Sequence, residues 1–146
     1  MSEMINLKID GIDVEVPKGT TILQAAKKAN IDIPTLCYLK EINEIGDCRI
    51  CIVEVEGRRG FATSCIQKAE EGMVVHTHSK QIMEARRVIL DLTCTRNGSC
   101  ELQTLAMKFN VMNVEYEGEK SVHKIDDLSP SIVRDFNKCI LCRRCI

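Results

Sequence analysis

The sequence is poor in aromatic residues and in net charge. Of its 146 residues only 3% are aromatic and none is tryptophan, so aliphatic side chains must build its core. It has no apolar run of the roughly 18 residues that a membrane-spanning helix needs, and its first residues show no secretory signal. The formal net charge of −1 gives no argument for a nucleic-acid partner or an anionic membrane. We therefore expect a cytoplasmic protein without a membrane span.

Cysteine, by contrast, is abundant. The nine cysteines form three groups: Cys37, Cys48, Cys51 and Cys65; then Cys94 and Cys100; then Cys139, Cys142 and Cys145. In a reducing compartment, clustered cysteines hold metal more often than they form disulfides. The sequence therefore predicts metal binding.

Residues 1–79 have the pattern of a compact α+β domain. Residues 5–9 and 12–16 alternate apolar and polar side chains, as half-buried strands do, and Asp10-Gly11 between them is a hairpin signal. Thr20 or Thr21 can cap a following helix that Asn30 can end, and further strands are expected over 51–55, 61–65 and 73–77. This order is that of a β-grasp ferredoxin, in which a helix crosses one face of a small mixed sheet.

Three further regions follow the first domain. Residues 80–112 are predicted to be helical, with one helix over 80–92 capped by Ser79 and another from near Cys100 to Asn110. Residues 113–130 are polar and are expected to form a connector. Residues 131–146 begin a new segment that carries the third cysteine group.

The first cysteine group has the spacing Cys37-x10-Cys48-x2-Cys51-x13-Cys65. A 2Fe–2S cluster needs four thiolates, two for each iron. The Cys-x2-Cys pair can supply two of them from one turn, and Cys37 and Cys65 can supply the others from outside it. The first gap is longer than in plant-type ferredoxins, which use x4 there. Gly46, just before the pair, is expected to allow close approach of the backbone.

A structural zinc site is the alternative for these four cysteines, because zinc also accepts four thiolates. Zinc sites usually use two short Cys-x2-Cys pairs, and residues 1–79 contain only one. We therefore predict a 2Fe–2S cluster.

Several stretches carry a resemblance to a known family. They are residues 33–38, 46–55, Cys65 with 71–75, 84–87, 97–103 and the cysteine run at the end of the chain. In these stretches the chain resembles the N-terminal iron–sulfur region of iron-only (FeFe) hydrogenases, of the large subunit of complex I and of some NAD-linked formate dehydrogenases. The resemblance implies a 2Fe–2S domain with a long first gap, followed by a helical 4Fe–4S segment and the start of a bacterial-type ferredoxin domain.

The second cysteine group departs from that family. The resemblance implies a 4Fe–4S cluster bound by His-x3-Cys-x2-Cys-x5-Cys, of which only the last two ligands, Cys94 and Cys100, are present. Roughly ten residues that would carry the other ligands look deleted. His76, His78 and His123 have the wrong spacing and are expected to be ordinary exposed histidines. We predict that Cys94 and Cys100 are free thiols in this chain.

The third group begins a bacterial ferredoxin run, Cys-x2-Cys-x2-Cys-x3-Cys-Pro. The chain stops one residue after Cys145, so Cys139, Cys142 and Cys145 lack the rest of the motif. We interpret the chain as a fragment or a truncated product, in which 4Fe–4S clusters would require a complete parent protein.

The sequence therefore predicts an electron-transfer module of a larger oxidoreductase, with no catalytic site of its own. Among the possible parent proteins, the iron-only hydrogenase is favoured over complex I and formate dehydrogenase, because the amino-acid sequence of residues 129–135 and 139–145 resembles it most. The expected partner is a flavin- or NADH-linked subunit or a ferredoxin. A free-standing ferredoxin-like carrier and a zinc-binding interaction protein are the alternatives.

Overall fold

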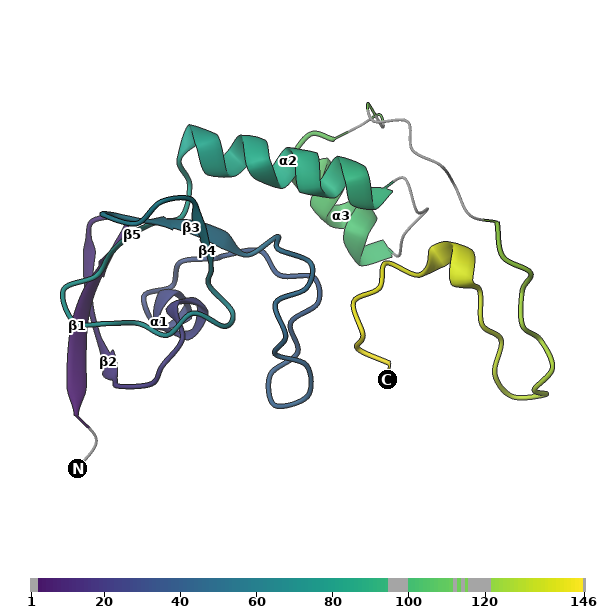
Figure 1. The fold of residues 1–146 in the computed structure, drawn as a ribbon, viewed down its shortest axis with the longest axis horizontal. Coiled ribbons are helices and arrows are strands. Elements are labelled where there is room, and N and C mark those ends of the chain that lie inside the picture. The colour runs from purple at the N-terminus through teal and green to yellow at the C-terminus, as the bar shows by residue number, and fades with distance from the viewer. Residues whose placement is uncertain (1–2, 95–99, 112, 114, 116–121, 146) are drawn as a thin grey trace. The chain divides into compact units, whose positions relative to one another are not determined.

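A computed structural model describes residues 3–94, 100–111, 113, 115 and 122–145 of the chain (Figure 1). Two compact units are present. One comprises residues 1–86 with 143–146, and the other comprises residues 87–142. The first unit contains the predicted sheet and helix, so the expected α+β fold is confirmed.

The first unit is built on a five-stranded mixed sheet with the order β2-β1-β5-β3-β4. The strands are β1 (Met4–Ile9), β2 (Ile12–Pro17), β3 (Ile52–Val55), β4 (Phe61–Thr63) and β5 (Val74–His76). Strand β5 lies parallel to β1 and antiparallel to β3, while the pairs β1–β2 and β3–β4 are antiparallel. The N-terminal hairpin and the β3–β4 pair are thus joined through β5.

The hairpin of β1 and β2 turns at Asp10-Gly11, as predicted. These residues have φ values of 48° and 85°, the left-handed conformations that a tight two-residue hairpin requires. Alternate residues of both strands face the core, where Leu7 is paired with Val14 and Ile5 with Val16.

Helix α1 (Ile22–Lys28) packs its apolar residues against the sheet. It begins with a capping box, in which Thr21 accepts from the Gln24 N–H and the Gln24 side chain accepts from the Thr21 N–H. It ends just before Asn30, whose φ of 58° stops the helix. The buried core of this unit consists of Ile5, Leu7, Ile9, Val14, Val16, Ile22, Leu23, Ala25, Ala26, Ile33, Cys51, Val53, Val55, Cys65, Ala69, Met73 and Val75.

Two helices follow the sheet. Helix α2 (Lys80–Cys94) is capped by the Ser79 hydroxyl, as predicted, and extends two residues beyond the predicted end. Helix α3 (Cys100–Lys108) ends before Asn110, which has a φ of 58°. The last described segment contains only a short 3₁₀ helix, η1 (Phe136–Lys138), as regular structure. No helix in the described residues is long and apolar enough to cross a membrane.

Candidate metal centre

The four cysteines of the first group lie on turns at one end of the β3–β4 pair. Cys51 lies immediately before β3, and Cys65 follows β4 by two residues. Both were predicted on the strands themselves, and this placement was wrong, because the chain turns before the strand pairing of Ile52 with Thr63 begins. On a strand, successive side chains point to opposite faces of the sheet. Cysteines on turns are not bound by this alternation.

The four thiols are arranged as two pairs. The Cys37 N–H donates to the Cys48 sulfur at 3.4 Å, and the Cys48 N–H donates to the Cys37 sulfur at 3.5 Å. A thiol hydrogen bond likewise joins Cys51 to Cys65. The ligands are thus paired first with second and third with fourth along the chain.

Each pair shares a proton. The hydrogen bond from the Cys48 thiol lowers the pKa of Cys37 to about 6, and the hydrogen bond from the Cys65 thiol lowers the pKa of Cys51 to about 7. The pKa values of the two donors, Cys48 and Cys65, are raised because each holds the shared proton against a neighbouring thiolate. Each pair therefore presents one thiolate near neutral pH, and thiolates are the form that binds metal.

Burial distinguishes the ligands. Cys37, Cys51 and Cys65 are at most 1% exposed, whereas Cys48 is only partly buried. The first pair is therefore the one nearer to solvent.

The loop between Cys37 and Cys48 is held closed by Asn43. Its side-chain amide donates to the Cys37 carbonyl at 2.8 Å, and its backbone exchanges two hydrogen bonds with Leu39. Asn43 is only 6% exposed, while Ile42 beside it is 72% exposed. The loop thus has an apolar tip in solvent and a polar anchor against the ligand.

The turn before Cys48 relies on Gly46, which has a φ of +69°. A Cβ atom there would lie 3.1 Å from Ile66 Cδ1 and 3.2 Å from Thr63 Cγ2. The close approach predicted for Gly46 is therefore made to these two side chains. Arg49, with a φ of +60°, donates from its guanidinium to the Thr63 hydroxyl at 2.9 Å.

The donor set fits a 2Fe–2S cluster better than a single zinc ion. Tetrahedral zinc needs all four ligands around one point. Two irons need two thiolates each, which is the pairwise arrangement seen here.

Within the part of the chain that the structure describes, no group of three or more His, Cys, Asp or Glu side chains could hold a metal ion. Cys94 ends α2, where burial raises the pKa of its thiol, and Cys100 begins α3. In the last segment, the Leu141 N–H donates to the Cys139 sulfur at 3.4 Å. The absence of bound metal at Cys94, Cys100, Cys139, Cys142 and Cys145 stays a prediction.

The three histidines have other neighbours. His76 Nε2 lies 2.9 Å from a Glu56 carboxylate oxygen, and His78 Nδ1 lies 3.7 Å from Asp10. His123 packs edge-on against the Phe136 ring. These contacts agree with the prediction of ordinary histidines near the surface.

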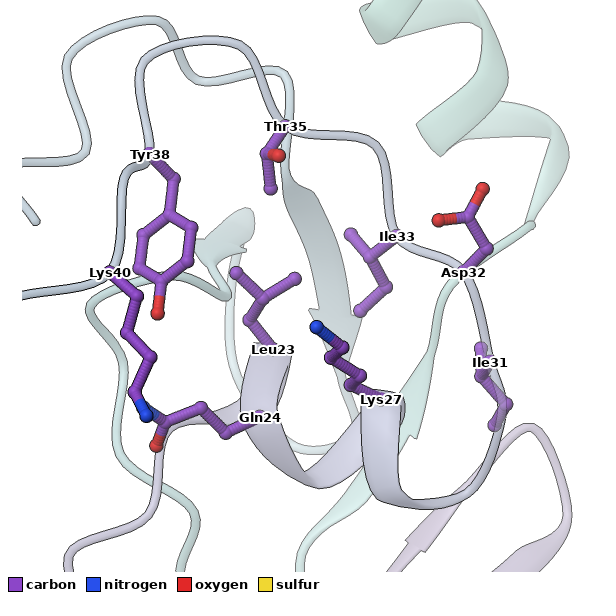
Figure 2. Close-up of a pocket in the computed structure, with 9 residues that line it drawn as sticks. All are labelled: Leu23, Gln24, Lys27, Ile31, Asp32, Ile33, Thr35, Tyr38 and Lys40. Carbon is purple, nitrogen blue, oxygen red and sulfur yellow. The ribbon is translucent and has the colours of Figure 1, made fainter. Parts of the chain in front are cut away.

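A separate pocket of about 650 Å³ lies between α1 and the segment leading to Cys37 (Figure 2). Its lining residues are Leu23, Gln24, Lys27, Ile31, Asp32, Ile33, Thr35, Tyr38 and Lys40. No cysteine lines it, so it is distinct from the candidate metal centre.

Sequence reasoning missed three side chains that support the Cys37 and Cys51 backbone: Asn43, Ser64 and Arg86. The Ser64 hydroxyl donates to the Cys51 carbonyl at 2.7 Å, and the Arg86 guanidinium donates to the carbonyls on either side of that residue. Arg86 could have been noticed, because it lies four residues from both Ile82 and Leu90 on the buried face of the predicted helix.

Comparison with known families gives two matches. Residues 2–80 match the model described as 2Fe-2S iron-sulfur cluster binding domain. Residues 92–115 match the NADH-ubiquinone oxidoreductase-G iron-sulfur binding region.

Curated relatives align along nearly the whole chain. It is 46% identical to NADP-reducing hydrogenase subunit HndD of Solidesulfovibrio fructosivorans, over 97% of the chain and 27% of that protein. It is 37% identical to an NADH-quinone oxidoreductase subunit of Rhizobium meliloti, over 98% of the chain and 18% of that protein. The first alignment spans 157 positions although the chain has 146 residues, so some positions of that relative have no counterpart here.

A solved structure shares the fold. An NAD+-reducing [NiFe]-hydrogenase in the H2-reduced state matches with a TM-score of 0.85 and 30% sequence identity, over 94% of this chain and 62% of that one. Relatives of the same region thus occur in proteins named for different electron donors and acceptors.

Proposed function

Because the chain belongs to the 2Fe-2S iron–sulfur cluster binding domain family, we propose that its four paired cysteines hold one 2Fe–2S cluster that carries single electrons. The observation that carries this proposal is the pairing of Cys37 with Cys48 and of Cys51 with Cys65.

The cluster, when bound, supplies a centre that gains or loses one electron. The chain contributes four thiolates, a buried setting for three of them, and hydrogen bonds that orient the turns. Cys48 is the ligand closest to solvent, so electrons would be exchanged at the Cys37–Cys48 side. The exposed Ile42 and Leu39 on the adjoining loop offer an apolar surface beside it.

The chain spans about a quarter of the hydrogenase subunit it resembles, and its role in a whole enzyme is a further proposal. We propose a parent of the iron-only hydrogenase type, which exchanges electrons with a flavin- or NADH-linked subunit or a ferredoxin in the cytoplasm. The 46% identity to a hydrogenase subunit, against 37% to a quinone oxidoreductase subunit, supports a hydrogenase over a complex I-type parent. In this proposal the chain itself performs no catalysis.

A complex I-type large subunit is the second candidate. The match of residues 92–115 to the oxidoreductase-G iron–sulfur region favours it. Reduction of the cluster by hydrogen in the complete parent protein would separate the two candidates, because only the hydrogenase type should show it.

The cluster proposal is tested by purifying the chain without oxygen and measuring iron, acid-labile sulfide and the EPR spectrum after reduction. We expect about two irons and two sulfides per chain. Cys48→Ala should abolish them, while the matched variant Cys94→Ala should leave them unchanged. Zinc in place of iron, or iron that survives Cys48→Ala, would overturn the proposal. Iron above two per chain that is lost in Cys94→Ala would overturn the prediction of free thiols.

A further inference from the structure

A buried arginine lies directly behind the Cys51 turn. Arg86 on α2 is 0% exposed, although its side chain is the largest of the fully buried set. Its Nε donates to the Ile50 carbonyl at 3.1 Å, and its Nη2 donates to the Ile52 carbonyl at 2.8 Å. Arg86 therefore holds the backbone on both sides of a ligand.

The carbonyl between the two that Arg86 contacts is also held by hydrogen bonds. The carbonyl of Cys51 itself accepts from the Ser64 hydroxyl at 2.7 Å and from the Ser64 N–H at 3.2 Å. All three consecutive carbonyls, from Ile50 to Ile52, are thus fixed by hydrogen bonds. The backbone that directs the Cys51 sulfur has little freedom left.

We propose that Arg86 is a positioning residue for the cluster, which fixes the Cys51 turn and supplies a buried positive charge that favours the reduced state. This inference rests on the proposed 2Fe–2S function. In this inference Arg86, which is not a ligand, controls how readily the cluster accepts an electron.

Burying the charged guanidinium of Arg86 costs free energy, which argues that the charge has a role at this site. Moving a guanidinium out of water costs several kcal/mol unless it is well compensated. Burial lowers the pKa of Arg86 to about 10, and the neighbouring charges of Cys51, Asp10 and Asp32 act against that shift. The side chain therefore remains charged at neutral pH.

The electrostatic consequence follows from the redox step. A bound cluster would accept one electron from the partner subunit or ferredoxin, which would be oxidised; no bond would break, and Arg86 would keep its proton. The reduced cluster would carry one more negative charge. A nearby positive charge stabilises the reduced form more than the oxidised form, and low surrounding polarity strengthens this difference.

The geometry also explains why arginine suits this position better than lysine. The planar guanidinium offers several donors in a fixed fork, which can reach two carbonyls two residues apart. An ammonium group offers the same charge at a single point. Arg86→Lys therefore separates the charge from the fork, and Arg86→Met removes both while keeping a long side chain.

The experiment compares Arg86→Met and Arg86→Lys with the iron-loaded wild-type chain. The reduced fraction is followed by EPR during a redox titration. At the wild-type midpoint potential, we expect the ratio of reduced to oxidised cluster to fall at least about tenfold in Arg86→Met. It should stay within about threefold in Arg86→Lys. Arg87→Met is the matched control, because Arg87 is the adjacent but exposed residue of α2, and its ratio should not change.

Unchanged reduction in an Arg86→Met chain with full iron would overturn the inference. If that chain does not retain iron, Arg86→Gln is titrated in its place, with the same expected fall and the same contrary result. Loss of iron from both neutral variants, with full iron in Arg86→Lys, supports the requirement for charge. Loss of iron from Arg86→Lys as well would support the positioning role of the guanidinium fork and would contradict a requirement for charge alone. A wild-type chain without iron would instead refute the proposed function.

Discussion

Asn43→Ala should weaken the candidate metal centre without removing a ligand. The Asn43 amide donates to the Cys37 carbonyl at 2.8 Å, and both residues are buried. Truncation would leave that carbonyl without this donor in a place that water reaches poorly. Leaving a buried polar group unsatisfied costs about 1–3 kcal/mol, so we expect a loss near the middle of this range.

The rest of the loop should survive this change. The two backbone hydrogen bonds between Leu39 and Asn43, at 2.7 and 3.0 Å, do not involve the side chain that is removed. The change should therefore act on the link between the loop and Cys37. It should appear as a lower free energy of unfolding and as faster loss of iron.

The assay is urea unfolding of the iron-loaded chain, followed by circular dichroism, together with the rate at which a ferrous chelator bleaches the cluster. Asn6→Ala is the matched control, because Asn6 is an exposed residue of β1. If Asn43→Ala lowers the free energy of unfolding and speeds bleaching no more than the control does, the anchoring role of Asn43 is wrong.

Three further predictions concern the helices and the thiols. Thr21→Ala removes the capping box of α1 and should lower the free energy of unfolding by about 1 kcal/mol, as measured in urea; no change would contradict the cap. Leu90→Ala, at a fully buried position of α2, should cost about 2–5 kcal/mol, whereas Leu92→Ala, at a position 51% exposed, should cost far less in the same melting experiment. In the metal-free chain, the pKa values of about 6 for Cys37 and about 7 for Cys51 mean that the folded state binds fewer protons than the unfolded state between about pH 7 and 8.5. Its melting temperature should therefore rise with pH across that range, and a flat or falling profile would refute the shared protons.

Local signals in the sequence predicted much of the first unit. The left-handed Asp10-Gly11 turn, the Thr21 cap and the Asn30 stop each depend on residues within one or two turns of chain. For this reason they could be read without knowledge of the fold. The mixed sheet crossed by one helix followed from the order of these elements.

Long-range contacts could not be predicted in the same way. The role of Arg86 depends on bringing α2 against carbonyls 34 and 36 residues earlier in the chain. No local pattern specifies that contact, although an arginine on an apolar helix face signals that some contact exists. The displacement of Cys51 and Cys65 from strands to turns also depends on where β3 and β4 begin to pair.

The parallel pairing of β1 with β5 has a consequence for how the protein is made. Lys8 lies opposite Val74, and all four cysteines of the candidate centre fall in the stretch between these partners. When parallel strands are far apart in sequence, the long loop between them must close before their pairing contributes favourable free energy, and this slows folding. A ribosome would have to release the chain beyond His76 before the sheet could close around its ligands. Cluster insertion should therefore follow synthesis of the whole first unit, and the unpaired thiols would remain open to oxidation until then.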